Sequence, residues 1–317
     1  MLRIILGLAI GFAGGVAFAL FVLVEPPAVR VPPPELPPET AAPPPVTALP
    51  PAPPPELPPA ASAPVPKPPP APAVAPGSYA GATAALLANP PAGTRYPGDV
   101  EADILDRLNA LRHERGLGQL RHRDGLRDAA RVHALRMQRD RFFAHEDPDG
   151  KGAGDRVAVV DRTGVYRTIG ENLGQIEPIL AGVGRDMHEG WVNSPGHFAN
   201  MIKPEFSHVG IGCAQDRRRT YCAQVFGQLA GTLGEAVPLA LAPGSQTALA
   251  ARLDGLEYGG WRLRDGHGKD RGQGTGSPLR VPAGLRGEMQ VSILGVRRQS
   301  VTRRLIYSLY GPAIVIR

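Results

Sequence analysis

The sequence predicts an α+β protein in which a membrane helix and a disordered proline-rich linker precede a central domain of helices and a β-hairpin, and a small β-domain follows it. Three observations predict this. An uncharged apolar run opens the chain, 24 of its 36 prolines lie in residues 26–76, and apolar residues after position 98 recur first at helical and then at strand spacing. The expected domains are 1–25, 26–97, 98–231 and 235–317.

The apolar run at the N-terminus predicts a membrane anchor. Ile4–Val24 are 21 uncharged residues, which as a helix would span about 31 Å, close to the hydrocarbon thickness of a bilayer. Arg3 in front of the run favours a cytoplasmic N-terminus. We therefore expect a single-pass protein of the inner, or cytoplasmic, membrane whose bulk is extracytoplasmic. The alternative is a signal peptide cleaved after Ala17-Phe18-Ala19, which would release a secreted chain.

Three glycines of the expected membrane helix, Gly7, Gly11 and Gly15, recur every four residues and share one helix face. Such a face lets a second helix approach closely, which gives a hypothesis of self-association through these glycines. Incidental glycines in a glycine-rich membrane segment are the alternative.

Residues 26–97 have the composition of a linker. Proline fixes φ and removes backbone donors, so the proline-rich part, 26–76, is expected to be disordered and to sample extended polyproline II. At about 3.1 Å per residue, its contour length is roughly 160 Å. Residues 77–97 are expected to continue it more loosely. The linker would hold the folded part away from the membrane.

The positive charge of the chain is concentrated at its C-terminal end. Residues 1–234 carry 23 Lys and Arg against 23 Asp and Glu, whereas residues 235–317 carry 12 against 6. A basic surface attracts anionic partners such as phospholipid or acidic wall polymer. Nucleic acid is not expected as a partner, because the folded part would face away from the cytoplasm. A solvated, arginine-rich surface without a partner is the alternative.

Apolar spacing in the central domain predicts helices and a hairpin. Four residues three or four positions apart mark one face of a first helix: Val100, Ile104, Leu108 and Leu111. A second helix, capped by Asp124, carries a stripe in which His133 is expected to be a buried, hydrogen-bonded core residue. Further helices are expected near residues 179–192 and 198–201. Residues 207–214 and 220–227 alternate apolar and polar side chains around a polar connection, which indicates a β-hairpin.

The predicted hairpin also pairs the two cysteines. With its loop centred between Arg217 and Arg218, Cys213 and Cys222 face each other at a separation close to what a disulfide needs. Export favours oxidation, so we predict a Cys213–Cys222 disulfide, with two buried thiols as the alternative. The spacing and number of cysteines exclude a CxxC redox motif or a zinc–thiolate site.

A series of short motifs runs through residues 99–230. They are Leu108-Asn109 with Arg112, Ala129-Ala130 with His133-Ala134, Phe142-Phe143-Ala144-His145, Gly170-Glu171-Asn172-Leu173, Trp191-Val192-Asn193-Ser194-Pro195-Gly196-His197 with Asn200-Met201, Gly210-Ile211-Gly212 and Gln224-Val225-Phe226-Gly227. Their order and spacing resemble the CAP superfamily of cysteine-rich secretory proteins, antigen 5 and plant pathogenesis-related proteins, and most closely its compact bacterial members. The resemblance implies an α–β–α sandwich in which helical layers enclose an antiparallel sheet.

The resemblance also implies a central cleft lined by two histidines and two acidic residues. Carried over by position, His145, His197 and Glu171 fill three of these places. Asn172 and Ser194 belong to the same motifs and are assigned to the cleft with them.

The second acidic residue of the cleft is missing. Residues 192–194, Val-Asn-Ser, stand where the larger members of the superfamily carry a glutamate after the tryptophan. Glu189 precedes Trp191 by two positions and would face elsewhere on a helix. Three alternatives stay open for the missing acid: Glu189 replaces it, Glu146 replaces it, or no residue does.

The three remaining cleft residues form a candidate metal site. Two histidines and one carboxylate are a sufficient ligand set for a divalent ion such as zinc with an open position, at which water could be activated. The alternative is a hydrogen-bonded network of His145, Glu171 and His197 that orders the cleft loops. Ser194 stands three residues before His197, but nothing marks an oxyanion hole, and a helix-initiating turn explains it better.

Residues 235–317 contain short apolar runs separated by Gly, Pro and Asp clusters, a spacing that predicts a small, basic β-domain. For the whole chain we expect a binding or interaction module of the cell envelope that recognises a lipid, a wall polymer or an envelope protein, since binding is the commoner role in the superfamily. Two alternatives stay open: a metal-assisted hydrolase of peptide or wall polymer, and a structural protein that bridges envelope layers.

Overall fold

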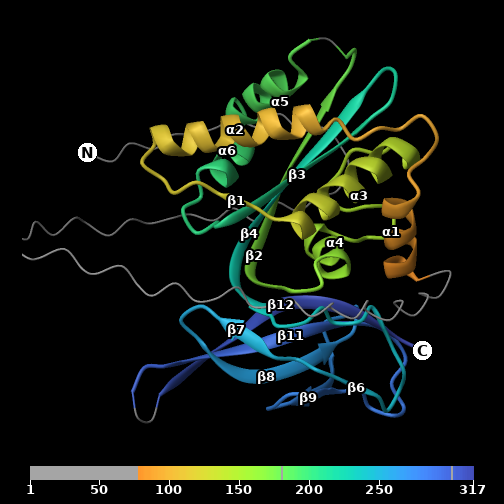
Figure 1. Ribbon diagram of the computed structural model, residues 1–317, viewed down its shortest axis with the longest axis vertical. Helices are drawn as coiled ribbons and strands as arrows, with labels where there is room; N and C mark the ends of the chain where they lie inside the picture. Colours follow the sequence, from red (N-terminus) through yellow and green to blue (C-terminus); the bar gives the residue numbers. More distant parts are fainter. Residues whose placement is uncertain (1–77, 180, 301–302) are drawn as a thin grey trace, which may run out of the picture. The chain divides into compact units, whose positions relative to one another are not determined.

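A computed structural model describes residues 78–179, 181–300 and 303–317 of the chain (Figure 1). The predicted membrane span, Ile4–Val24, its glycine face and most of the predicted linker lie outside these ranges. No helix within the ranges is long and apolar enough to cross a membrane.

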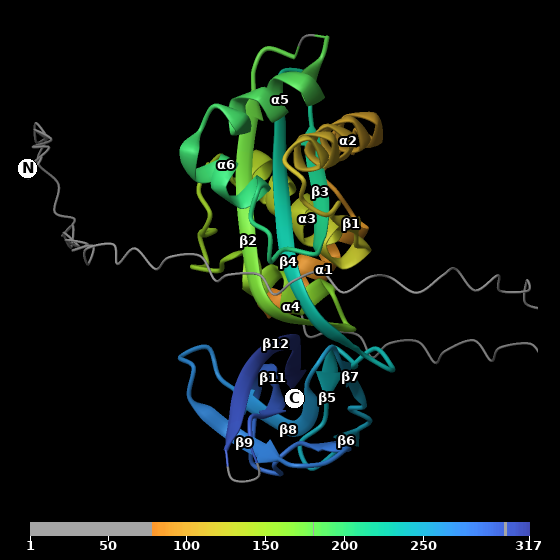
Figure 2. The same cartoon turned by 90° about the vertical axis from the view of Figure 1, so that its left-hand side faces the viewer.

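The described residues form a mixed fold of six helices and a large sheet. Its central strands run in the order β1-β3-β4-β2: β1 (Arg121–His122), β3 (His208–Gln215), β4 (Thr220–Leu233) and β2 (Gly164–Ile176). One apolar core joins one face of these strands to α1 (Tyr79–Ala88), α3 (Asp124–Asp140) and α4 (Ala153–Val160). A second core joins the other face to α2 (Gly98–Glu114), α5 (Val183–Val192) and α6 (Pro195–Met201). Figure 2 shows the strands between these two helical layers.

The helices follow the periodicity of the sequence. Ile104, Leu108 and Leu111 are buried on α2, as their spacing predicts, because they lie on one face of a 3.6-residue helix. His133 is fully buried on α3, in agreement with the prediction of a core histidine. The N-cap lies one residue before the predicted position. Asp124 is the first residue of α3, and Arg123 holds the N-cap position without a side-chain hydrogen bond.

The hairpin and its disulfide are confirmed. Strands β3 and β4 pair antiparallel, with Cys213 opposite Cys222, and the two sulfur atoms are bonded at 2.02 Å. Both cysteines are fully buried in the core beneath α2.

The expected linker ends earlier than residue 97. Tyr79–Ala88 form α1, and Ser78 caps it by accepting a hydrogen bond from the Gly81 backbone at 3.0 Å. Ala80 and Leu86 are buried. This stretch is rich in alanine and free of proline, so it favours a helix once its apolar face packs on the rest of the domain.

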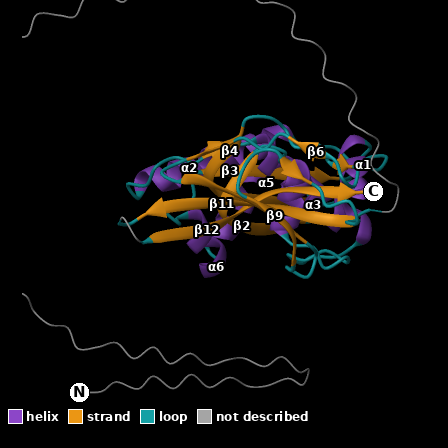
Figure 3. Ribbon diagram, turned by 90° about the horizontal axis from the view of Figure 1, so that it is seen from below, coloured by secondary structure: helices purple, strands orange, loops and turns teal. Residues whose placement is uncertain are grey.

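The C-terminal residues are built from strands around a third apolar core, to which Val165 of β2 and Ala230 and Leu233 of β4 also contribute. The longest are β11 (Gly287–Arg298), β12 (Arg304–Ile316), β8 (Glu257–Arg264) and β9 (Asp270–Gly274). Short strands complete this part: β5 (Ala240–Leu241), β6 (Gln246–Thr247), β7 (Ala251–Leu253) and β10 (Leu279–Arg280). Figure 3 shows β11 and β12 running side by side, as their antiparallel pairing requires. Because β12 pairs with β2 at Tyr310 and Tyr166, and β7 pairs with β4, the C-terminal strands continue the central sheet.

Candidate functional site

Strand β2 carries the two central residues of the candidate site, Glu171 and Asn172. They pair with Val225 and Gln224 of β4. Neighbouring side chains of a strand point to opposite faces, so the two residues serve different helical layers. Glu171 bonds to groups beside α3 and α4, whereas Asn172 bonds to α6.

The Glu171 carboxylate is buried and has partners on both of its oxygens. Oε2 lies 2.9 Å from His145 Nδ1, and Oε1 accepts a hydrogen bond of 2.7 Å from Arg156 Nη2. His133 Nε2 approaches Oε2 to 4.0 Å and lies 2.9 Å from the carbonyl oxygen of Ala144. The carboxylate is therefore neutralised by a guanidinium group and oriented by a histidine.

The partners of Glu171 decide its ionisation. Burial alone would raise the pKa of Glu171, but the hydrogen bond with His145 and the charge of Arg156 outweigh it and hold the pKa below its usual value. The same hydrogen bond raises the pKa of His145. Burial, helped by the Arg156 charge, lowers the pKa of His133 to about 4, so His133 is neutral at pH 7. Glu171 and Arg156 form a buried ion pair, and His145 can gain a proton beside them.

His197 lies at the start of α6 but does not join this cluster through a hydrogen bond. Its backbone carbonyl accepts a bond of 3.0 Å from Asn172 Nδ2, and its buried ring Nδ1 has no hydrogen-bond partner among the residues that the structure describes. Burial and the nearby charge of His145 lower the pKa of its ring. The structure thus brings His145 and Glu171 into contact and places His197 next to them.

Asn172 is the centre of a buried amide network. Its side-chain nitrogen donates to His197 O and to Gln224 Oε1, each at 3.0 Å, and its oxygen accepts from Asn200 Nδ2 at 3.0 Å. Trp191 of α5 adds a bond of 2.7 Å to the backbone oxygen of Leu173. These bonds fix α5 and α6 to strand β2, and through them they fix the position of His197.

Ser194 occupies the N-cap position of α6. Its carbonyl accepts the first helical hydrogen bond, from Phe198 N at 2.8 Å, and its side chain makes no cap bond. Within the described residues, no hydrogen bond joins its hydroxyl to His197.

The described residues do not form a metal site. No group of three or more His, Cys, Asp and Glu side chains within them could hold an ion. Arg156 pairs with Glu171 at 2.7 Å, and its positive charge opposes a cation beside that carboxylate. The ring of His145, whose side chain is 60% exposed, is the part of the cluster that faces solvent.

Neither candidate for the missing acid contacts the cluster. Glu189 is exposed and approaches Arg185 at 4.0 Å on its own helix, and Glu146 is exposed. The residue that stands beside Glu171 is Arg156, which the motif pattern did not indicate. One feature of the sequence could have indicated Arg156: it directly precedes the apolar run Val157–Val160. A charged side chain next to a buried segment needs a partner of opposite charge.

Comparison with known proteins places the matches in the central part of the chain. Residues 105–227 match the model of the cysteine-rich secretory protein family, CAP. The uncharacterised protein YkwD of Bacillus subtilis is 30% identical over 115 residues, which cover 35% of this chain and 41% of YkwD. The uncharacterised membrane protein YlbC of the same organism is 28% identical over 114 residues, 35% of this chain and 31% of YlbC.

A solved extracellular protein with an SCP domain, from Bacillus anthracis, is 24% identical with a TM-score of 0.36, and the match covers 41% of each chain. The chain thus spans less than half the length of the two curated relatives that it matches. Its motifs, its sheet between two helical layers and the family match meet in the same segment, residues 105–227, which form a domain of the CAP, or cysteine-rich secretory protein, type.

Proposed function

We propose that this protein is a recognition module of the cell envelope, held on the outer side of the cytoplasmic membrane by the predicted span Ile4–Val24 and the predicted linker. The observation that carries the proposal is the Glu171 carboxylate, whose two oxygens are both bonded while the His145 ring faces solvent. A buried, neutralised and hydrogen-bonded cluster orders a binding surface.

Two further observations support an extracytoplasmic location. The buried Cys213–Cys222 disulfide is of the kind that persists in oxidising compartments. The relative YlbC is named as a membrane protein, which agrees with a membrane anchor here. The ligand of the protein described here would be a lipid, a wall polymer or another envelope protein.

Binding to defined envelope components tests the proposal. The full chain, solubilised in detergent, is incubated separately with purified wall polymer and with anionic phospholipid vesicles, and bound protein is measured by sedimentation. We expect retention on at least one component and at least tenfold weaker retention of His145→Ala, whereas Arg139→Ala, which alters a surface pair with Asp140, should bind like the wild type. Equal retention of His145→Ala and the wild type would contradict a role for this surface.

The same assay separates the alternatives. Zinc-dependent release of fragments from the wall polymer would favour the hydrolase. A structural bridge predicts instead that retention depends on the paired arginines of the β11–β12 hairpin, Arg297, Arg298, Arg303 and Arg304, and not on His145.

A further inference from the structure

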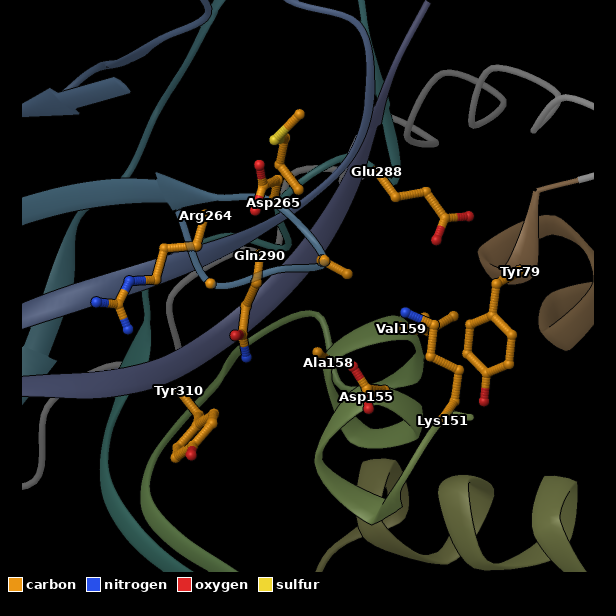
Figure 4. A pocket seen from close by; sticks show the side chains of 14 residues that line it. Tyr79, Lys151, Asp155, Ala158, Val159, Arg264, Asp265, Glu288, Gln290 and Tyr310 are labelled. Atoms are coloured by element: carbon orange, nitrogen blue, oxygen red, sulfur yellow. The ribbon is translucent and has the colours of Figure 1, made fainter. Parts of the chain in front are cut away.

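A cavity of about 280 Å³ lies between α4 and the C-terminal strands. Lys151 and Asp155 border it from the CAP side, and Glu288, Gln290 and Tyr310 border it from β11 and β12. Figure 4 shows Gln290 and Asp155 reaching into the same space from opposite sides, with Tyr310 beside them. The cavity is near the lower end of the size range of ligand pockets, roughly 300–1,000 Å³. None of its lining residues belongs to the cluster around His145.

Several polar groups around the cavity lack a full set of partners. Within the described residues, the Lys151 ammonium makes no ion pair. It makes a cation–π contact with Tyr79, with its Nζ 5.8 Å from the ring centroid. The side-chain amide of Gln290 and the hydroxyl of Tyr310 make no hydrogen bond in the described part of the chain. These groups offer both donors and acceptors to a ligand.

The carboxylates of Asp155 and Glu288 each accept a hydrogen bond through only one oxygen within the described residues. Asp155 accepts one bond through Oδ2, from the Gly152 backbone at 3.0 Å, and Glu288 accepts one through Oε1, from the Ala80 backbone at 3.2 Å. The second oxygen of each remains an open acceptor. The other charged lining residues are already neutralised, since Arg264 pairs with Asp270 and Asp265 pairs with Arg271.

The charges and open hydrogen-bonding groups around the cavity disfavour several classes of ligand. Two open carboxylates repel an anion such as phosphate, and the ammonium of Lys151 offsets part of their attraction for a cation. A lipid chain would strip water from all five polar groups without replacing it, at about 1–3 kcal/mol for each group. A neutral ligand rich in hydroxyl groups avoids these costs, because each hydroxyl can donate to a carboxylate and accept from the ammonium or the amide.

The apolar surfaces of the cavity fit the same ligand class. Ala158, Val159, Met289 and Ala313 supply an apolar lining, and the Tyr310 ring, with 47% of the residue exposed, lies at the open side. A sugar ring has polar edges and a less polar face, and an aromatic ring covers such a face. We propose that this cavity binds one sugar unit of a neutral glycan, as a second recognition site that is independent of the His145 surface.

Saturation-transfer NMR on the full chain, in a detergent without sugar headgroups, tests the assignment. The probes are cellotetraose and the tetramer of N-acetylglucosamine, with tetraalanine as a zwitterionic comparison. We expect transfer to at least one saccharide, and binding weakened about five- to tenfold in Gln290→Ala and in Tyr310→Ala, the effect of losing one hydrogen bond or one ring contact. Ser308→Ala, exposed on the same strand but outside the cavity, is the matched control and should bind like the wild type.

His145→Ala separates this proposal from the proposed function, because it should leave saccharide binding unchanged. Loss of saccharide binding in His145→Ala, with Gln290→Ala unaffected, would move the site to the other surface and overturn the assignment. Tighter binding of tetraalanine than of both saccharides, or no saccharide signal at millimolar concentration, would overturn it as well.

Discussion

The Arg156 guanidinium group donates a hydrogen bond of 2.7 Å to Glu171 Oε1, and both side chains are buried. Desolvating two charges costs several kcal/mol, which their attraction offsets only when the remaining donors and acceptors are satisfied. Arg156 meets this condition in large part, since it also donates to the carbonyls of Lys151 and His145. The pair joins α4 to β2, and the bond from Arg156 to the carbonyl of His145 joins α4 to the loop that carries this histidine.

Removing Arg156 should therefore destabilise the protein strongly. Arg156→Met leaves the Glu171 carboxylate buried without its guanidinium partner, and breaking a buried pair in this way costs about 3–5 kcal/mol. Urea unfolding of the purified full chain measures the change in the free energy of unfolding. The double variant Arg156→Met with Glu171→Gln should recover part of the loss, because no buried charge remains.

Arg139→Met is the matched control for this prediction. Arg139 pairs with Asp140 at the surface, where its side chain is 45% exposed, and such pairs contribute at most about 1 kcal/mol. An Arg156→Met variant as stable as Arg139→Met would show that the buried pair contributes no more than a surface one.

Stability should fall in mild acid because of His133. Its pKa is about 4 in the folded state and 6.5 when exposed, so the unfolded chain binds more protons between these values. The contribution of neutral His133 is complete above pH 6.5 and is lost as the pH falls towards 4, on the order of 3 kcal/mol in total. Urea midpoints measured from pH 7.5 to 4 check this, and His133→Gln should flatten the slope. An unchanged slope in His133→Gln would assign the acid sensitivity to other groups.

Local patterns in the sequence were sufficient for helices α2, α3, α5 and α6 and for the hairpin. The stripe of Ile104, Leu108 and Leu111 and the facing positions of Cys213 and Cys222 depend on spacing along one or two neighbouring elements, which the chain itself sets. The contact between His145 and Glu171 was predicted only through the family resemblance, because nothing in their spacing brings them together.

Contacts between distant segments were not visible in the sequence. Arg156 finds Glu171 only after α4 packs on β2, and Tyr310 of β12 pairs with Tyr166 of β2 across more than a hundred residues. Helix α1 was missed because its neighbourhood is dominated by proline, although its own alanine-rich segment favours a helix. In each case, packing partners far along the chain decide the outcome.

The Cys213–Cys222 disulfide should contribute about 2–3 kcal/mol to stability. It closes a short loop, with a sequence separation of 9, and the loss of chain entropy in the unfolded state scales weakly with loop length. The double variant Cys213→Ala with Cys222→Ala, compared with the wild type in urea under oxidising conditions, measures this. Under strong reduction the difference should shrink to the small cavity effect of the substitutions, and a difference that stays unchanged would mean that the bond is not formed in solution.

Two glycines of β3 let α3 pack directly on the strand. An ideal Cβ on Gly210 would lie 2.0 Å from the backbone nitrogen of Arg127, and one on Gly212 would lie 2.2 Å from that of Arg131. Neither contact involves the end of a flexible side chain, so helix and strand would have to separate. Gly210→Ala should therefore lower the free energy of unfolding by about 3 kcal/mol or more, as an overpacked core does.

Gly190, inside α5, provides the matched control, because nothing lies within 4 Å of the Cβ that an alanine would add there. Alanine has the higher helix propensity, so Gly190→Ala should raise the free energy of unfolding by up to about 1 kcal/mol. Opposite signs for the two substitutions, measured in the same urea titration, would tie the cost at Gly210 to the contact with α3. If Gly210→Ala is as stable as the wild type, α3 does not lie directly on β3, and the positions of the His133 and Arg136 side chains on that helix would have to change as well.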